Sequence, residues 1–258
     1  MKLVFIKTVL LLLILNEMYS ASNIDWKKKS FDKFAIFYSE KDSNNVHDFK
    51  KYLEDGIRKI EGYFGESFLK TFDIYLFPSR KDLDAQWGKD WNIPDFKSEC
   101  WMVASGVAHR LDILSTDRWK TEACEHNPDD KDHIQKILTH ELVHVFHGQN
   151  NPVPDFNNLD DIGWLIEGLA VLVSGQLDSN RMKDLVDAKS QDKLPSKLKD
   201  GWKGKYRYSV CGSLVDFIEK RFGKAVITEL LNKTAEKEIL NVLGITEEKF
   251  LSEWRTSL

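Results

Sequence analysis

The amino-acid sequence predicts an α+β fold, with a mixed sheet in the N-terminal part and a mainly helical C-terminal lobe. Two runs rich in aromatic and β-branched residues, 31–39 and 72–77, are typical of strands. Between them, residues 46–64 carry apolar side chains at helical spacing and are followed by Gly65. Helical spacing returns over residues 206–222, beyond the polar middle of the chain. Separate runs of strands and helices favour the α+β class.

The first 22 residues are expected to be an export signal. Lys2 and Lys7 supply positive charge, residues 8–15 a short apolar core, and residues 20–22 small side chains for cleavage. The apolar run is too short for a comfortable membrane span, and an uncleaved anchor is the alternative. The sequence therefore predicts a secreted or periplasmic protein, with no stable membrane association after the signal is cleaved.

The rest of the chain, residues 23–258, suits one domain with a shared core. We divide it into an N-terminal α+β lobe (23–98), a central part (99–178) and a helical C-terminal lobe (179–258). The formal net charge is −4, with both signs mixed along the chain. Nucleic-acid binding favours a clustered basic surface, so no nucleic-acid partner is expected.

Two further strands are predicted over 101–107 and 110–115, after a short helix over 79–88. The segment 110–115 alternates polar and apolar residues and lies shortly before the next helix. We expect it to be an edge strand that is open to an extended peptide. An ordinary half-buried strand is the alternative.

The most distinctive motif of the chain is His-Glu-Leu-Val-His at residues 140–144. It lies within a helix predicted over 129–148. Asn127 is the expected N-cap and Pro128 the first helical residue, while Gly148 suits the C-terminal end.

His140 and His144 stand one turn apart on one face of this helix, with about 6 Å between their Cβ atoms. That spacing lets both imidazoles bind one tetrahedral zinc ion, with Glu141 beside them as general base. His147, one turn further along, is the rival candidate for the third ligand.

The third ligand is predicted at Glu167, the one charged residue in the apolar run 164–173. A lone carboxylate in a buried helix is costly unless it is paired, and a dication held by two histidines is such a partner. Two histidines and a glutamate form a known catalytic zinc set that leaves one position open for water. In the polar loop 149–162, Asp160 or Asp161 is a candidate either to orient a ligand histidine or to cap a helix.

The C-terminal third is less patterned. Residues 179–205 are charged and irregular, which predicts a solvated segment or, alternatively, a lid over the cleft. The helix over 206–222 is expected to end at Gly223. Residues 224–232 and 246–256 are expected to form short helices.

Three cysteines are present. Cys100 and Cys124 flank one segment and are candidates for a disulfide in an oxidising compartment, although the sequence leaves the pairing open. Cys211 would then remain as a buried thiol. No cysteine has a histidine and acid setting of its own, so a nucleophilic cysteine is not expected.

The motif at 140–144, together with Trp-Leu-Ile-Glu-Gly-Leu-Ala at 164–170, resembles the gluzincin metallopeptidases, specifically the compact peptidase-MA-like proteins. The second motif is also similar to that of the zinc aminopeptidases. Residues 208–223 and 250–254 resemble later helices of the same group. The resemblance extends over about residues 100–256.

This resemblance implies a thermolysin-like, or zincin-like, catalytic fold with one zinc ion on His140, His144 and Glu167 and with Glu141 as base. It also implies that Tyr208 stabilises the oxyanion, the alternative being a tyrosine that packs on the surface. Two features depart from relatives. Val171 stands where some carry a histidine-orienting aspartate, and no Gly-Ala-Met-Glu-Asn signature is present upstream. The second departure favours an endopeptidase over an exopeptidase.

The sequence thus predicts an exported zinc peptidase that acts on a peptide or protein substrate. One alternative is a zinc hydrolase of other amides, such as cell-wall or lipid material. Another is a binding protein on a zincin fold that has lost catalysis. The intact set of ligands and base argues against the last, because a structural zinc site needs neither a base nor an open position.

Overall fold

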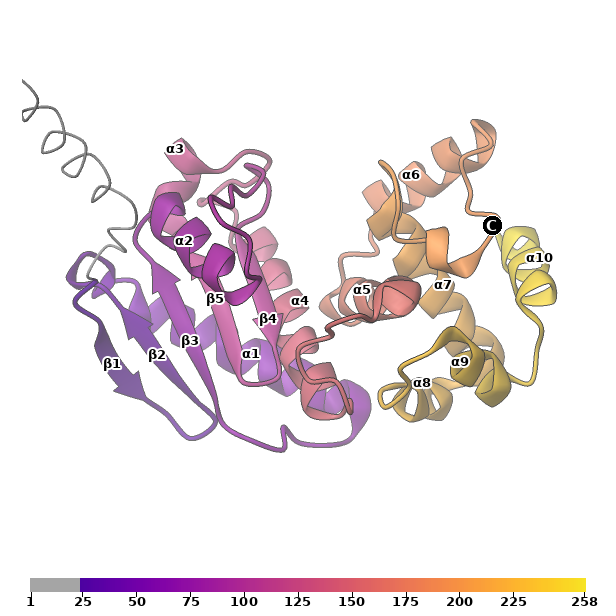
Figure 1. The fold of residues 1–258 in the computed structure, drawn as a ribbon, viewed down its shortest axis with the longest axis horizontal. Helices are drawn as coiled ribbons and strands as arrows, with labels where there is room; N and C mark the ends of the chain where they lie inside the picture. The colour runs from indigo at the N-terminus through magenta and orange to yellow at the C-terminus, as the bar shows by residue number, and fades with distance from the viewer. Residues whose placement is uncertain (1–23) are drawn as a thin grey trace, which may run out of the picture.

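The computed structural model describes residues 24–258 and shows two lobes that meet along two central helices (Figure 1). A five-stranded sheet with its helices forms the N-terminal lobe, and helices form the C-terminal lobe. This arrangement confirms the predicted α+β class, with a mixed sheet followed by a mainly helical part. The export signal expected over residues 1–22 lies outside the described residues. No helix within 24–258 is both long and apolar enough to cross a membrane.

The sheet has the strand order β1-β2-β3-β5-β4. Its three central strands are parallel, and both outer strands run antiparallel to their neighbours. Ile36, Ile74 and Leu111 lie side by side across the parallel strands and are fully buried. The strands are β1 (Lys27–Ser30), β2 (Phe34–Tyr38), β3 (Phe72–Phe77), β4 (Ala104–Val107) and β5 (Arg110–Leu114).

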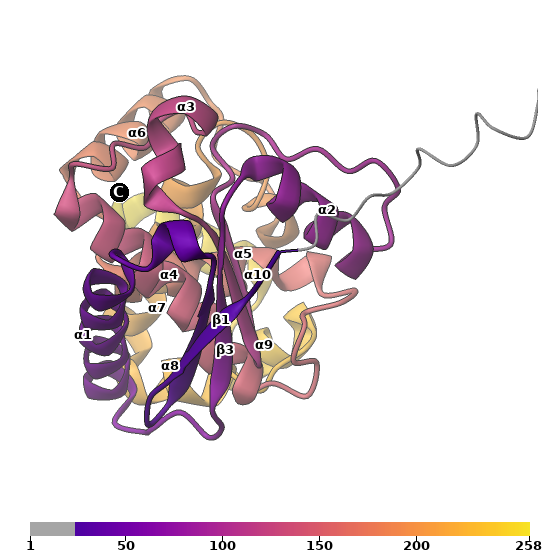
Figure 2. The same cartoon turned by 90° about the vertical axis from the view of Figure 1, so that its left-hand side faces the viewer.

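Helices cover both faces of the sheet, with α1 and α4 on one side and α2 on the other (Figure 2). α1 coincides with the predicted helix over 46–64 and ends at Gly65, whose φ of 73° suits glycine. The α-helices of this lobe and of the centre are α1 (Val46–Phe64), α2 (Arg80–Asp90), α3 (Trp119–Glu122), α4 (Lys131–Gln149) and α5 (Gly163–Ser174). Those of the C-terminal lobe are α6 (Ser179–Ser190), α7 (Arg207–Phe222), α8 (Lys224–Leu230), α9 (Glu236–Leu243) and α10 (Glu247–Ser257).

The expectation that residues 110–115 form an edge strand is wrong. β5 lies between β3 and β4, and β4 forms the edge next to α4. The polar position that suggested a solvent-facing side, Asp112, is buried and pairs with Arg110. The alternation along this strand therefore comes from a buried ion pair rather than from contact with water.

The ends of α4 also differ from the prediction. Its N-cap is Asp130, whose side chain accepts a hydrogen bond from the backbone N–H of His133. Asn127 instead accepts one from the N–H of Asp129 in the preceding turn. Gly148 lies inside the helix, where a Cβ would stand 2.6 Å from the carbonyl oxygen of Pro154. This glycine permits close packing instead of ending the helix.

α5 and α7 pack closely against each other in the core of the C-terminal lobe. A Cβ on Gly168 would lie 2.4 Å from the carbonyl oxygen of Cys211 and 2.5 Å from the Val215 side chain. Glycine is therefore required where the two helix backbones meet. This contact fixes the position of α5, and with it the neighbouring Glu167.

The segment 179–205 is more regular than expected. α6 occupies residues 179–190 and is capped by the side chain of Asp178, which accepts two backbone hydrogen bonds. It buries only Leu185 and Ala188, so its sequence shows little apolar pattern. α9 was not predicted either. Four short 3-10 turns complete the described chain: 40–42, 116–118, 160–162 and 198–200.

Cys100 and Cys124 form a disulfide with a Cα–Cα distance of 5.2 Å. Cys211 is the remaining thiol and is buried in α7. Both observations agree with the pairing considered from the sequence. The disulfide holds Trp101, which lines the cleft described below, close to the segment that leads into α4.

Candidate metal centre

Three side chains from two helices converge on one point. The Nε2 atoms of His140 and His144, both on α4, lie 3.2 Å apart. Oε2 of Glu167, on α5, lies 3.4 Å from the first nitrogen and 3.8 Å from the second. One ligand atom from each residue lies within 4.8 Å of the other two. The structure thus brings together the three residues that the sequence singled out as metal ligands.

These distances fit a tetrahedral zinc site. Ligand atoms about 2.0–2.1 Å from zinc lie roughly 3.4 Å from one another at tetrahedral angles. The three separations of 3.2, 3.4 and 3.8 Å bracket that value. Two imidazoles and one carboxylate are also the donor set of known catalytic zinc sites.

The protonation states of Glu167 and His144 suit a cation. Burial would lower the pKa of His140, the third member, but Glu167 and Glu141 beside it raise that pKa above the ordinary value. Burial would raise the pKa of Glu167, but His144 and His140 beside it hold that pKa below the ordinary value. Burial lowers the pKa of His144 to about 4. An ionised carboxylate and a neutral imidazole are the forms that bind zinc.

Glu141 lines the same cleft as the three cluster residues. Burial raises its pKa to about 7, with a further contribution from Glu167, while His140 and the backbone of Gly106 act in the opposite direction. A carboxyl group with a pKa near neutrality can both accept and return a proton.

Strand β4 lies directly against the motif helix. A Cβ on Gly106 would stand 2.4 Å from the backbone oxygen of Glu141, so no larger residue fits there without a shift. One edge of the sheet therefore borders the cleft at the position of Glu141.

Gln176 contacts His140 at the ring nitrogen that faces away from the cluster. Its Oε1 lies 3.0 Å from Nδ1 of His140 and can only accept, so Nδ1 carries a proton and Nε2 is the nitrogen that faces the cluster. Neither Asp160 nor Asp161 hydrogen-bonds a cluster histidine within residues 24–258, so their candidacy as orienting residues is wrong. Gln176 was not predicted, because it reaches the site only through the turn at Gly175, where φ is 81°.

His147, the rival ligand, lies outside the cluster of three. Its side chain is fully buried, with its ring centroid 5.0 Å from that of Phe156. Burial lowers its pKa to about 3. His147 is thus a core residue of α4 in this structure.

Tyr208, at the start of α7, lines the cleft rather than packing on an outer surface. Its ring centroid is 6.1 Å from that of His140. Burial, together with Glu167, raises its pKa above the ordinary value, so the hydroxyl remains a proton donor at neutral pH.

The cluster opens into a cleft with a volume of about 450 Å³. β4 and the chain just before it line one side, and α4 and α5 line the floor. Residues from α6 and α7 line the opposite side. The cleft therefore runs between the two lobes.

The fold is similar to that of yeast LTA4 hydrolase. The native structure of that enzyme matches with a TM-score of 0.52 and 14% sequence identity, over 91% of this chain and 39% of that chain. Its structure in complex with bestatin matches with a TM-score of 0.52 and 13% identity, over 90% and 37%. No protein-family model matches the sequence, and the comparison with curated proteins gives no match. The chain spans about two fifths of the length of these solved structures, and at this identity the likeness is one of fold.

Proposed function

We propose that the protein is a zinc-dependent peptidase of the gluzincin type, with a thermolysin-like catalytic fold. The observation that carries this proposal is the convergence of His140 Nε2, His144 Nε2 and Glu167 Oε2, with Glu141 lining the same cleft. The likeness of the fold to that of a hydrolase supports it. Its substrates are peptides or proteins.

When bound, zinc supplies a Lewis acid that polarises the scissile carbonyl and acidifies water. Glu141 takes a proton from the attacking water and delivers it to the leaving amine. Its near-neutral pKa and its position in the cleft suit both transfers. His140, His144 and Glu167 would hold the ion.

Tyr208 donates a hydrogen bond to the carbonyl oxygen as negative charge develops there. Its raised pKa keeps the hydroxyl protonated through neutral pH, and its ring stands beside His140. This is the role that the resemblance to gluzincins assigns to a tyrosine at this position.

The backbone of β4 binds the substrate as an added strand. β4 is the outermost strand on this side of the sheet and has no further strand beside it within residues 24–258. An extended peptide can therefore add to it through main-chain hydrogen bonds. Gly106 keeps this edge next to Glu141, the proposed base.

The proposed setting is outside the cytoplasm, and the proposed mode of action is that of an endopeptidase. The signal-like residues 1–22 support export, and the disulfide between Cys100 and Cys124 fits an oxidising compartment. The missing Gly-Ala-Met-Glu-Asn signature supports internal cleavage.

Substitution Glu141→Gln tests the function. The variant should still bind zinc, because its three proposed ligands are intact, but it should lose peptide hydrolysis by at least about a hundredfold, since the base is gone. The measurement pairs zinc analysis with turnover of a mixed peptide library. Hydrolysis at the wild-type rate in a zinc-loaded Glu141→Gln protein would refute the assignment.

A further inference from the structure

We infer that Arg181 forms a carboxylate-binding subsite at one end of the cleft. It selects substrates that carry a carboxylate on the carboxyl side of the bond to be cleaved. This inference rests on the proposed peptidase function and adds a substrate class to it. The carboxylate is either the free C-terminus of a short peptide or an aspartate or glutamate side chain.

Arg181 lies close to the proposed reaction centre. The centre of its guanidinium is 5.2 Å from the ring centroid of Tyr208, whose ring is 6.1 Å from that of His140. All three residues line the cleft. An extended chain advances about 3.4 Å per residue, so the guanidinium is within reach of about the second residue beyond the cleaved bond.

The guanidinium of Arg181 has no strong partner. Within residues 24–258 the one carboxylate near it is that of Asp184, whose Oδ2 lies 3.6 Å from Nη1, beyond hydrogen-bond distance. The same Oδ2 already accepts a hydrogen bond from Ser209 at 3.1 Å. The Arg181 side chain is only 34% exposed. Its donors match a planar carboxylate, which arginine binds through two parallel hydrogen bonds.

A second arginine, Arg207, lies equally close to Tyr208, with its guanidinium 5.2 Å from that ring centroid. This guanidinium also lies 4.8 Å from the ring centroid of Trp101 and 5.2 Å from that of Trp202. It packs between aromatic rings from both lobes. Of the two arginines, Arg181 is the one among the residues that line the cleft.

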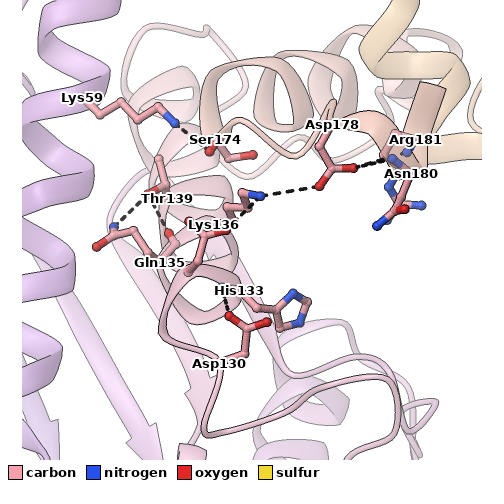
Figure 3. A network of polar contacts seen from close by, with 11 residues as sticks. Lys59, Asp130, His133, Gln135, Lys136, Thr139, Ser174, Asp178, Asn180 and Arg181 are labelled. Atoms are coloured by element: carbon pink, nitrogen blue, oxygen red, sulfur yellow. Dashed lines mark hydrogen bonds and ion pairs between the residues drawn. The ribbon is translucent and has the colours of Figure 1, made fainter. Parts of the chain in front are cut away.

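The backbone of Arg181 is fixed relative to the motif helix. Oδ1 of Asp178 accepts hydrogen bonds from the N–H groups of Asn180 and Arg181. Oδ2 of Asp178 lies 3.5 Å from Nζ of Lys136 on α4 (Figure 3). The first turn of α6 is therefore tied to the N-terminal half of α4, which limits the entropy that ligand binding would cost.

The direction of β4 puts the carboxyl side of a substrate at this end. Gly106 lies against Glu141, and a Cβ on Gly148 would stand 2.9 Å from the N of Ala108, so β4 and the residue after it run in the same direction as α4. A peptide that adds antiparallel to β4 runs the opposite way, toward the N-terminal half of α4. Residues after the cleaved bond therefore approach Arg181.

The acidic side chains along the cleft do not oppose this direction. Asp155, Asp160 and Glu125 line the cleft, but all three are exposed, so water screens their charges.

The test compares three peptides with zinc-loaded wild-type protein and the Arg181→Gln variant. The parent peptide is blocked at both ends. The second peptide carries Glu in place of Gln two residues after the bond cleaved in the parent, and the third ends at that residue with a free carboxylate. Arg58→Gln is the matched control, because Arg58 is an exposed arginine on α1.

We expect at least one carboxylate peptide to exceed the parent in kcat/KM by about 10- to 100-fold, the range for hydrogen bonds to a charged group. The peptide that shows the gain identifies the recognised carboxylate as that of a side chain or that of a C-terminus. In Arg181→Gln, the ratio of kcat/KM for the carboxylate peptide to kcat/KM for the parent peptide should fall to about 1. The preference for the carboxylate peptide should be partly retained in Arg181→Lys, which keeps the positive charge but lacks the two parallel donors of the guanidinium. It should be fully retained in Arg58→Gln. Equal rates for the three peptides in wild type, or an unchanged ratio in Arg181→Gln, would overturn the subsite.

Binding of the same peptides to zinc-loaded Glu141→Gln protein separates the two proposals. If wild type cleaves none of the peptides, the peptidase function fails. A carboxylate preference in binding that disappears when Arg181→Gln is added would still support the subsite. Equal binding of the three peptides would overturn it, whatever the outcome for hydrolysis.

Discussion

Oε1 of Gln176 accepts a hydrogen bond from Nδ1 of His140 over 3.0 Å, and the opposite nitrogen of that ring faces His144 and Glu167. The amide thus holds the orientation of one proposed metal ligand. The resemblance to gluzincins suggested a histidine-orienting aspartate four residues after the glutamate ligand, but in this chain that position is Val171. A neutral amide from the α5–α6 connection stands behind the histidine instead.

Substitution Gln176→Ala should weaken zinc binding by about 10- to 100-fold, because partners behind metal-binding histidines typically contribute that much. Competition with a chromogenic chelator measures the affinity directly and does not depend on turnover. Gln191→Ala is the control, since the side chain of Gln191 hydrogen-bonds Tyr206 and lines no part of the cleft. Wild-type affinity in Gln176→Ala would show that this hydrogen bond does not matter for the metal.

The close contact of α5 with α7 at Gly168 can be tested by substitution of this glycine. Gly168→Ala should destabilise the protein by about 1–3 kcal/mol, because its Cβ would overlap the backbone of Cys211. Gly62→Ala, on α1 with no atom within 4 Å of its added Cβ, should stabilise it by about 0.5–1 kcal/mol. Urea unfolding of the metal-free proteins measures both changes. An equal response of the two variants would contradict the close contact.

Asp112 gives the stability a pH dependence. Burial raises its pKa from 3.8 to about 6, against the opposing effect of Arg110. The folded state holds the proton of Asp112 more tightly than the unfolded state does. The stabilisation that this proton provides is complete below about pH 4 and is lost as the pH rises through 6. Relative to Asp112→Asn, the wild type should lose about 2 kcal/mol of unfolding free energy between pH 4 and pH 7. Parallel pH profiles for the two proteins would contradict the raised pKa.

The elements with the clearest local patterns were predictable from the sequence. α1 and β3 have the predicted bounds, because their apolar spacing and the Gly65 and Pro78 that follow them are local features. Glu167 was predictable for a different reason. It is the one charge in an otherwise apolar helix, and burial of a charge demands a partner.

Features that depend on long-range contacts were missed. β1 consists of four exposed residues, and only its pairing with β2 makes it a strand. The order of β4 and β5 in the sheet is likewise a tertiary property that alternation cannot reveal. Gln176 and Arg181 reach the cleft through the turn and helix that follow α5, so their distance in sequence from the motif hides them.

Zinc stoichiometry of the purified protein tests the central claim most directly. Wild type, freed of metal and dialysed against limiting zinc, should bind one equivalent, and His144→Ala should bind less than a tenth as tightly because one of three ligands is lost. Substitution of the neighbouring His147, as His147→Gln, should leave the stoichiometry at one. No zinc in the wild type, or equal affinity in His144→Ala, would contradict a metal centre formed by His140, His144 and Glu167.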